Sequence, residues 1–375
     1  MASEKQPNDD LFARLLEQYE QTLSQQTDAT ELGEVPTNEP LKTRLELARE
    51  CLRILKQAGV GSDQATPLVA NRFGKYQLMR RLGQLNSGLT YLAFDTLGGR
   101  RVVLKVVPIR SERLYEQLVA QFQRLVSPLH PHALSFHEVG RIHGLAYLAR
   151  PYVHGLSLAD WLARQKQALS PSLAVQVGLV LCETIGAVHA QGLLHRNLKP
   201  SNVLLRLADP ASPTPPIAPE FPYHPLIVDF DMPSWAEMVH STLVATSIEQ
   251  LAVYLAPEQI ERSVEPLTPA VDVYGLGGLL YEMLAGRYPF AAPRLDELVR
   301  QILQQPPPPL SRLGVPVELE QIVSTCLRKQ PQLRYLNVQR LADDLRRVQA
   351  GQKPIGVPLG FWHRLTQFWR QRKRS

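Results

Sequence analysis

The spacing of apolar residues changes along this chain of 375 residues, from a strand-like pattern to a helical one. Strand-like segments separated by glycine-containing turns come first and enclose one helical segment at 112–126; they are 76–82, 90–94, 101–107, 136–139 and 145–149. Beyond Gly155 helical spacing dominates, at 157–165, 173–190, 268–286, 295–304, 317–327 and 337–349. A small sheet followed by a larger helical part predicts an α+β fold of two lobes.

The chain is expected to have three parts. The two-lobe domain spans 72–351, with a small lobe at 72–152 and a large lobe at 153–351. Residues 1–71 hold two amphipathic segments, which predict a helical hairpin and a linker. This part carries 7 basic and 12 acidic groups. It either docks on the basic two-lobe domain or forms a separately solvated helical pair. Residues 352–375 form a basic tail.

One stretch inside the large lobe is unusually rich in proline. Residues 208–225 hold seven prolines. Proline lacks a backbone N–H and is disfavoured inside helices and central strands. This stretch is therefore predicted to be a long exposed loop.

Composition and charge restrict the class of protein. Apolar residues make up 44% of the chain, so a packed core is expected. The net charge is +6, and the last 24 residues alone carry six basic groups and no acid. The excess therefore indicates a basic tail, and we expect no specific nucleic-acid ligand. The N-terminal residues lack the apolar run of a secretory signal, and no stretch approaches about 18 consecutive apolar residues. We expect a cytoplasmic protein.

Cysteine and histidine do not form a recognisable metal motif. The three cysteines (Cys51, Cys182 and Cys326) lie far apart, which favours free thiols. His130, His132 and His137 cluster in sequence, but their spacing matches no known ligand set, so turn and surface histidines are the preferred interpretation.

The tail has aromatic residues on one helical face. The five apolar residues at this spacing are Phe361, Trp362, Leu365, Phe368 and Trp369. A helix this short is marginal in water and needs a surface on which to form. Three surfaces remain open: the large lobe of the same chain, an unknown protein partner, and an anionic membrane contacted peripherally by 361–374.

Six motifs follow one another in the order and spacing of a known family. They are YQLMRRLGQLNSGLTYLAFDTLGGRRVVLKVV at 76–107, HRNLKPSNVLL at 195–205, VDFD at 228–231, APEQI at 256–260, DVYGLGGLLYEMLAGRYPF at 272–290, and Arg334. Over about 76–350 the chain resembles bacterial serine/threonine protein kinases. The resemblance implies the two-lobe kinase fold, with a small antiparallel-sheet lobe and a large helical lobe.

The resemblance also assigns nucleotide contacts. Gly83 and Gly88 would belong to the glycine-rich turn whose backbone N–H groups approach ATP phosphates. Lys105 would hold the α- and β-phosphates.

Metal-binding and catalytic positions follow in the same way. Asn202 and Asp229 would coordinate Mg²⁺ through side-chain oxygens. Lys199 would neutralise the transferred phosphate. The position of the catalytic aspartate, which accepts the proton of the substrate hydroxyl, is Asn197. An amide has no basic carboxylate oxygen.

Other departures affect phosphate positioning. Leu85 replaces the middle glycine of the phosphate turn. Gln121 stands at the position where the family has a helix glutamate that pairs with the strand lysine. The nearest glutamate on that helix is Glu116. The metal motif ends in Asp231 in place of glycine, and Leu251 stands where a threonine usually supports the catalytic aspartate.

Residues at the positions that surround adenine in the family also differ from the family pattern. Arg150 falls at the gatekeeper position and Pro151 at the next one. Val103 replaces a small alanine, and Thr90 replaces a valine. Together these changes predict weak or no binding of Mg-ATP.

Scaffold positions are retained. His195 can still stack on Phe230, Asp272 can hold the catalytic-loop backbone, and Glu258 can pair with Arg334. We therefore expect a pseudokinase that acts as a signalling or scaffold module. The alternative is an active or weakly active serine/threonine kinase with a non-standard catalytic loop.

Overall fold

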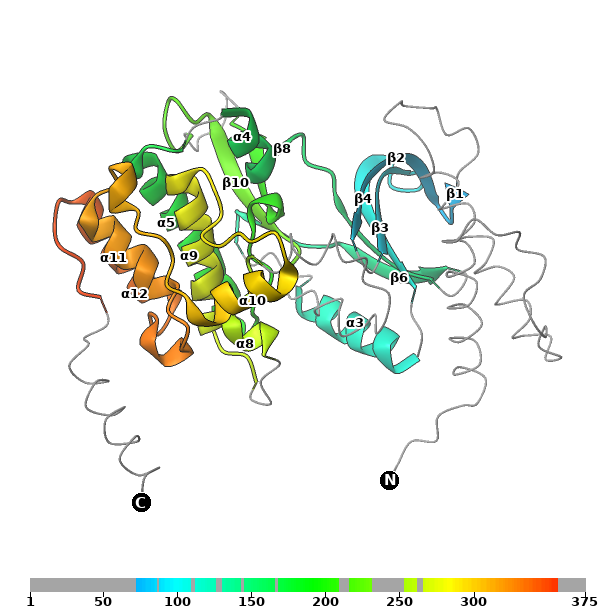
Figure 1. Ribbon diagram of the computed structural model, residues 1–375. Helices are drawn as coiled ribbons and strands as arrows, with labels where there is room; N and C mark the ends of the chain where they lie inside the picture. The colour runs from blue at the N-terminus through cyan, green and yellow to red at the C-terminus, as the bar shows by residue number, and fades with distance from the viewer. Residues whose placement is uncertain are drawn as a thin grey trace, which may run out of the picture. The chain divides into compact units, whose positions relative to one another are not determined.

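A computed structural model (Figure 1) describes residues 72–85, 88–108, 112–125, 130–142, 145–165, 168–208, 216–230, 253–261 and 266–356. These residues form two compact units. The small unit holds 72–125 and 135–152, and the large unit holds 130–134 and the described residues from Val153 onward. The predicted hairpin in 1–71 and the amphipathic segment at 361–374 lie outside the described residues.

The small unit is an antiparallel sheet with one helix. Its strands lie in the order β1-β2-β3-β4-β7-β6. They are β1 Arg72–Phe73, β2 Tyr76–Leu85, β3 Gly88–Asp95, β4 Arg100–Pro108, β6 Glu138–Ile142 and β7 Leu145–Pro151, with helix α3 at Glu112–Leu125. Tyr76 and Leu78 are buried while Gln77 and Met79 are exposed, because successive side chains of a strand face opposite sides. The alternation predicted from the sequence thus places one face of the sheet in the core.

The two glycines of the predicted glycine-rich turn lie in strands. Gly83 pairs with Thr90, and Leu85 pairs with Gly88, so both glycines lie in the strands of a β2–β3 hairpin. A register shift between Arg81 and Gly83 marks an irregularity in β2. The strands predicted at 76–82 and 90–94 are therefore longer than expected, because β2 continues to Leu85 and β3 begins at Gly88.

The large unit is mainly helical. Its helices are α4 Leu158–Gln165, α5 Pro171–Ala190, α8 Pro257–Ile260, α9 Ala270–Ala285, α10 Leu295–Gln304, α11 Val317–Cys326 and α12 Val338–Gln349, with 3-10 turns η2 Pro200–Asn202, η3 Ser311–Leu313 and η4 Pro331–Leu333. The hydroxyl of Ser170 accepts a hydrogen bond from the N–H of Leu173, which caps α5.

Helix α5 forms the centre of the large unit. Among the described residues it is the one helix long and apolar enough to cross a membrane by length and composition. It contacts α9 and α12, and most of its apolar side chains are buried. Cys182 of α5 and Cys326 of α11 are buried free thiols, as predicted, and burial raises the pKa of both. Cys51 lies outside the described residues.

A four-stranded sheet in the large unit corrects the prediction that residues 208–225 are wholly a loop. Its order is β5-β10-β9-β8, with β5 Ala133–Leu134, β8 Gly155–Ser157, β9 Val203–Leu207 and β10 Tyr223–Val228. The last residues of the proline-rich stretch thus belong to an inner strand. Pro225 pairs with Leu205, while β5 pairs only with Ile227 and Val228 of β10. The missing N–H of Pro225 therefore breaks no bond to β5. Residues 209–215 lie outside the described part.

Candidate active site

The catalytic loop lies between α5 and η2 and is fixed by Asp272 of α9. One carboxylate oxygen, Oδ2, accepts from the N–H of His195 at 2.8 Å and contacts Nε2 of His189 at 2.8 Å. The other, Oδ1, accepts from the N–H of Arg196 at 2.7 Å. Asp272 is buried, so these bonds satisfy a carboxylate that would otherwise be costly to bury. The prediction that Asp272 holds this backbone is confirmed.

His195 is the buried centre of the loop. Its Nε2 lies 3.0 Å from the carbonyl oxygen of Val228, and its Nδ1 accepts from the N–H of Asn197 at 3.2 Å. These partners require the neutral tautomer with the proton on Nε2, and burial lowers the pKa of His195. Its ring contacts Phe230 edge-on at 5.0 Å, so the two rings meet as predicted but edge to face and not stacked.

Asn197 is held at the base position by its backbone. Its N–H donates to His195, and its carbonyl oxygen accepts from Nδ2 of Asn202 at 2.8 Å. The amide nitrogen of Asn202 is thus engaged inside the loop, and its Oδ1 is the atom suited to a metal. Lys199 and Asp229 are buried in the same unit. Asp229 follows Val228 directly and has φ of +67°, a strained value for a residue with a side chain.

Carboxylate and amide oxygens suit Mg²⁺. The side-chain oxygens of Asp229 and Asn202 are therefore of the type that suits this metal. The structure thus brings Asn197, Lys199, Asn202 and Asp229 together in one unit, on the loop after α5 and the residue after β10.

Lys105 belongs to the small unit. It lies in β4 opposite Leu148 and is 5% exposed, with its ammonium 5.8 Å from the centroid of the Phe136 ring. Two residues earlier, Val103 pairs with Arg150. Arg150 is buried as well, and its guanidinium approaches the carbonyl oxygen of Pro151 at 3.5 Å. The position predicted to be the gatekeeper thus carries a buried cation.

Helix α3 carries an acidic residue in a different contact from the one that the family uses. Glu112, in its first turn, accepts from Nη1 of Arg141 at 2.6 Å. The guanidinium of Arg141 also lies 4.4 Å from the centroid of the Tyr115 ring. Glu116 is exposed, and the side chain of Gln121 lies outside the described part. Arg141 therefore anchors this helix to strand β6.

The pair between Glu258 and Arg334 is confirmed. Two parallel bonds of 2.7 and 2.8 Å join the guanidinium to the carboxylate. Arg334 also donates to the carbonyl oxygen of Ala270, and its guanidinium lies 4.8 Å from the centroid of the Tyr274 ring. This network fixes α8 against the start of α9.

Gln259 is a contact that sequence reasoning missed. Its Oε1 accepts from the N–H of Ala256 at 3.0 Å, and its Nε2 donates to the carbonyl oxygen of Arg196 at 2.9 Å. Gln259 thus ties α8 to the catalytic loop. In the sequence, the one indication of this contact is that Gln259 directly follows the motif residues Ala256–Glu258. Glutamine by itself indicates no particular bonding partner.

Comparison with known proteins identifies the class. The protein kinase domain family matches residues 76–344. The chain belongs to this family, and the two described units have its antiparallel-sheet and helical architectures.

Particular relatives are bacterial. The chain is 31% identical over 288 residues to the serine/threonine-protein kinase PknD of Mycobacterium tuberculosis, which covers 75% of this chain and 40% of PknD. It is 31% identical over 279 residues to Pkn1 of Myxococcus xanthus, covering 72% of this chain and 38% of Pkn1. The chain therefore spans less than half the length of these two relatives.

A solved structure shows the same fold. The kinase domain of Mycobacterium tuberculosis PknI aligns with a TM-score of 0.55 and 21% identity, covering 74% of this chain and 97% of that domain.

Proposed function

We propose that this member of the family is a pseudokinase that acts in signalling by binding a protein partner. The observation that carries the proposal is the position of Asn197. An intact scaffold of Asp272, His195 and Gln259 holds the catalytic loop, yet the residue at the base position has an amide side chain. The loop is therefore ordered without the group that would remove the substrate proton.

The loss of the base does not act alone. General-base catalysis contributes about 10²–10⁴ in rate. Phosphoryl transfer depends mainly on positioning and charge neutralisation, so a kinase can retain activity without its base. Here Gln121 and Leu85 also replace residues that position phosphates. The changes together support a non-catalytic module.

Nucleotide binding is proposed to be weak or absent. The retained residues Lys105, Asn202 and Asp229 would hold the phosphates and Mg²⁺ of a bound nucleotide, which would supply the phosphoryl group. Against binding stand Val103 and the buried guanidinium of Arg150 on the adenine side.

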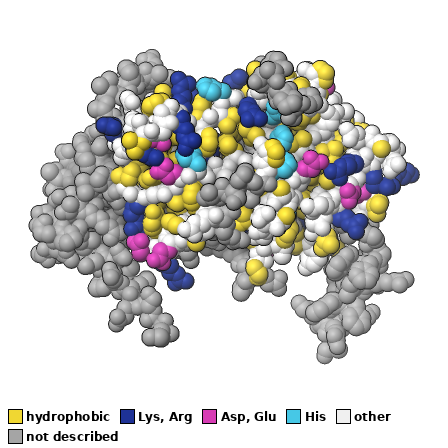
Figure 2. Space-filling model, turned by 180° about the vertical axis from the view of Figure 1, so that it is seen from behind, with side chains coloured by type: hydrophobic (Ala, Val, Ile, Leu, Met, Phe, Trp, Pro, Cys, Tyr) yellow, Lys and Arg dark blue, Asp and Glu magenta, His cyan; other side chains and the backbone are white. Residues whose placement is uncertain are grey.

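A protein partner is favoured over nucleic acid. Among the described residues drawn in Figure 2, which shows one face, Lys and Arg side chains lie in separate groups among apolar and acidic ones within each unit. Nucleic-acid-binding surfaces instead concentrate Lys and Arg in one patch or stripe.

Thermal denaturation with Mg-ATP tests the nucleotide part of the proposal. We expect a melting temperature that moves by less than about 2 °C at millimolar Mg-ATP. Asp229→Asn and Lys105→Met should behave like the unaltered chain. A large shift at micromolar Mg-ATP that both substitutions abolish would contradict it.

The alternative is an active or weakly active serine/threonine kinase. It is favoured by the same retained residues, Lys105, Lys199, Asn202 and Asp229. A phosphotransfer measurement separates the two functions.

A further inference from the structure

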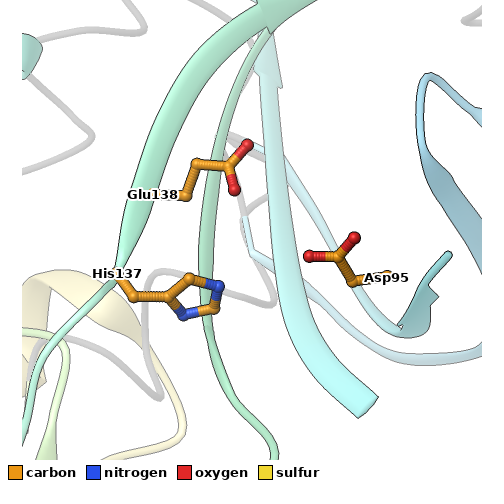
Figure 3. A group of neighbouring side chains, drawn as sticks. All are labelled: Asp95, His137 and Glu138. Carbon is orange, nitrogen blue, oxygen red and sulfur yellow. The ribbon is translucent and has the colours of Figure 1, made fainter. Parts of the chain in front are cut away.

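A second cluster of ionisable side chains lies in the small unit, apart from the residues to which the resemblance assigns nucleotide, metal or catalytic roles. Asp95 ends β3, Glu138 begins β6, and His137 precedes Glu138. Ligand-type atoms of these three residues all lie within 4.8 Å of one another. Figure 3 shows the three side chains pointing into one space.

Strands β3 and β6 are not neighbours in the strand order. Curvature of the sheet therefore has to bring their ends close to each other. The Tyr147 ring of β7 meets Tyr76 of β2 at 5.4 Å and Phe73 of β1 at 5.9 Å, both edge-on. The turn between β1 and β2 therefore lies against β7. Gly74 in this turn has φ of +57°, which favours glycine.

Both carboxylates are oriented by bonds outside the shared space. Oδ1 of Asp95 accepts from the N–H groups of Leu97 and Gly98, at 3.1 and 3.0 Å. Oε1 of Glu138 accepts from the hydroxyl of Tyr147 at 2.8 Å. Such outer bonds fix the direction of metal ligands in proteins. One oxygen of each carboxylate remains directed at the common space.

A cation already lies where these two oxygens converge. Nζ of Lys75 is 2.6 Å from Oε2 of Glu138 and 3.3 Å from Oδ2 of Asp95. The ammonium of Lys75 does not bond to the imidazole of His137. Within the described part of the chain, neither buried ring nitrogen of His137 has a hydrogen-bond partner. A metal ion at this place would use all three groups.

We propose that Asp95, His137 and Glu138 bind one divalent transition-metal ion, best represented by Zn²⁺, in exchange for the Lys75 ammonium. Zn²⁺ accepts a mixture of imidazole nitrogen and carboxylate oxygen, with water in the fourth position. Its charge balances the two carboxylates once Lys75 has turned away. The Lys75 side chain is one-quarter exposed, so its ammonium has a route to solvent. Mg²⁺ prefers an all-oxygen shell and is selected against by the imidazole.

The function of this site is a clamp on the small unit. The ion would join the ends of β3 and β6 beside the β1–β2 turn, where the ammonium of Lys75 now bridges Asp95 and Glu138. Metal binding should therefore raise the stability of the small unit, and none of its three ligands is a predicted nucleotide-binding or catalytic residue.

The test is a titration of the tag-free full chain with Zn²⁺ by calorimetry and with Co²⁺ by visible absorption. We expect one equivalent of metal to bind at this site. Lys75→Met removes the competing cation and should tighten Zn²⁺ binding at least about tenfold. His137→Ala should weaken it at least about tenfold, and Mg²⁺ should not compete.

His132→Ala is the matched control. His132 is a half-buried histidine of the large unit, with its Nδ1 against the carbonyl of Pro225. Its substitution should leave the affinity unchanged. Circular dichroism checks folding, and Glu138→Gln, which keeps the acceptor for Tyr147, provides a second ligand variant that should also weaken binding. Equal Zn²⁺ affinity in the unaltered chain and both ligand variants, or no binding by Lys75→Met, would overturn the proposal.

Discussion

At the scale of single residues, buried polar side chains hold an unfavourable backbone in place. Arg196 has φ of +63°, a value that costs energy for any residue with a Cβ atom. Its N–H donates to Asp272 and its carbonyl accepts from Gln259, so the peptide groups on both sides are fixed. The strain is thus maintained by the surrounding hydrogen bonds.

Asp272→Ala should destabilise the large unit by about 3 kcal/mol, because buried donors of His195, Arg196 and His189 would lose their acceptor. Urea unfolding measures the change. The control is Asp343→Ala, an exposed carboxylate bonded to Arg346 of the same helix, which should cost less than about 0.5 kcal/mol. Equal losses in the two variants would contradict this account of the loop.

Glu282 predicts a pH dependence of stability. Burial raises the pKa of Glu282 to about 7, and the hydroxyl of Tyr254 contacts it at 2.6 Å. The folded state then holds a proton that the unfolded state releases above about pH 4.5. The free energy of unfolding therefore falls as pH rises from about 4.5 to 7. As pH rises from 5 to 8, the free energy of unfolding of Glu282→Gln, measured with urea, should increase by about 2–3 kcal/mol relative to that of the unaltered chain. A difference in unfolding free energy between the two chains that stays constant over this pH range would contradict the prediction.

At the scale of helices and strands, long periodic segments were predictable and short ones were not. Helices α5, α10 and α12 fall within two residues of the predicted ranges, because sustained apolar periodicity marks a buried face. Strand β10 was missed because its neighbourhood is full of proline. Strands β5 and β8 are too short to show any period.

Some contacts described above could likewise be predicted from the sequence, and others could not. Contacts of Asp272, His195 and Arg334 could be predicted because each residue stands at a motif position. The cluster of Asp95, His137 and Glu138 could not, because the curvature of the sheet brings those strand ends together, and no local pattern encodes that curvature.

Arg334→Lys tests how helices α8 and α9 are joined. Lysine keeps the charge but cannot form two parallel bonds to Glu258 or reach the carbonyls that the guanidinium contacts. We expect a loss of about 3 kcal/mol, seen in urea unfolding. Arg300→Lys alters an exposed pair with Glu297 at 3.8 Å and should change stability by less than about 0.5 kcal/mol. Similar effects of the two substitutions would refute a special role for Arg334.

At the scale of the whole molecule, the basic tail is the part for which we propose a separate contact. Its aromatic and basic residues at 361–374 suit an anionic membrane surface. The full chain should co-sediment with vesicles containing phosphatidylserine, and a chain ending at Gly351 should not. High salt should reduce the bound fraction, because each basic residue contributes about 1 kcal/mol near such a surface. Equal sedimentation of both chains, or of neither, would exclude the membrane.

The central claim, that the kinase fold here no longer transfers phosphate, is tested most directly by one rate. The initial rate of labelled phosphate transfer from ATP, with Mg²⁺ or Mn²⁺, is measured on the chain itself and on a general protein substrate. The unaltered chain should not exceed Lys105→Met, and Asn197→Asp should gain little, because Leu85 and Gln121 remain. A robust rate that Lys105→Met abolishes would contradict the account.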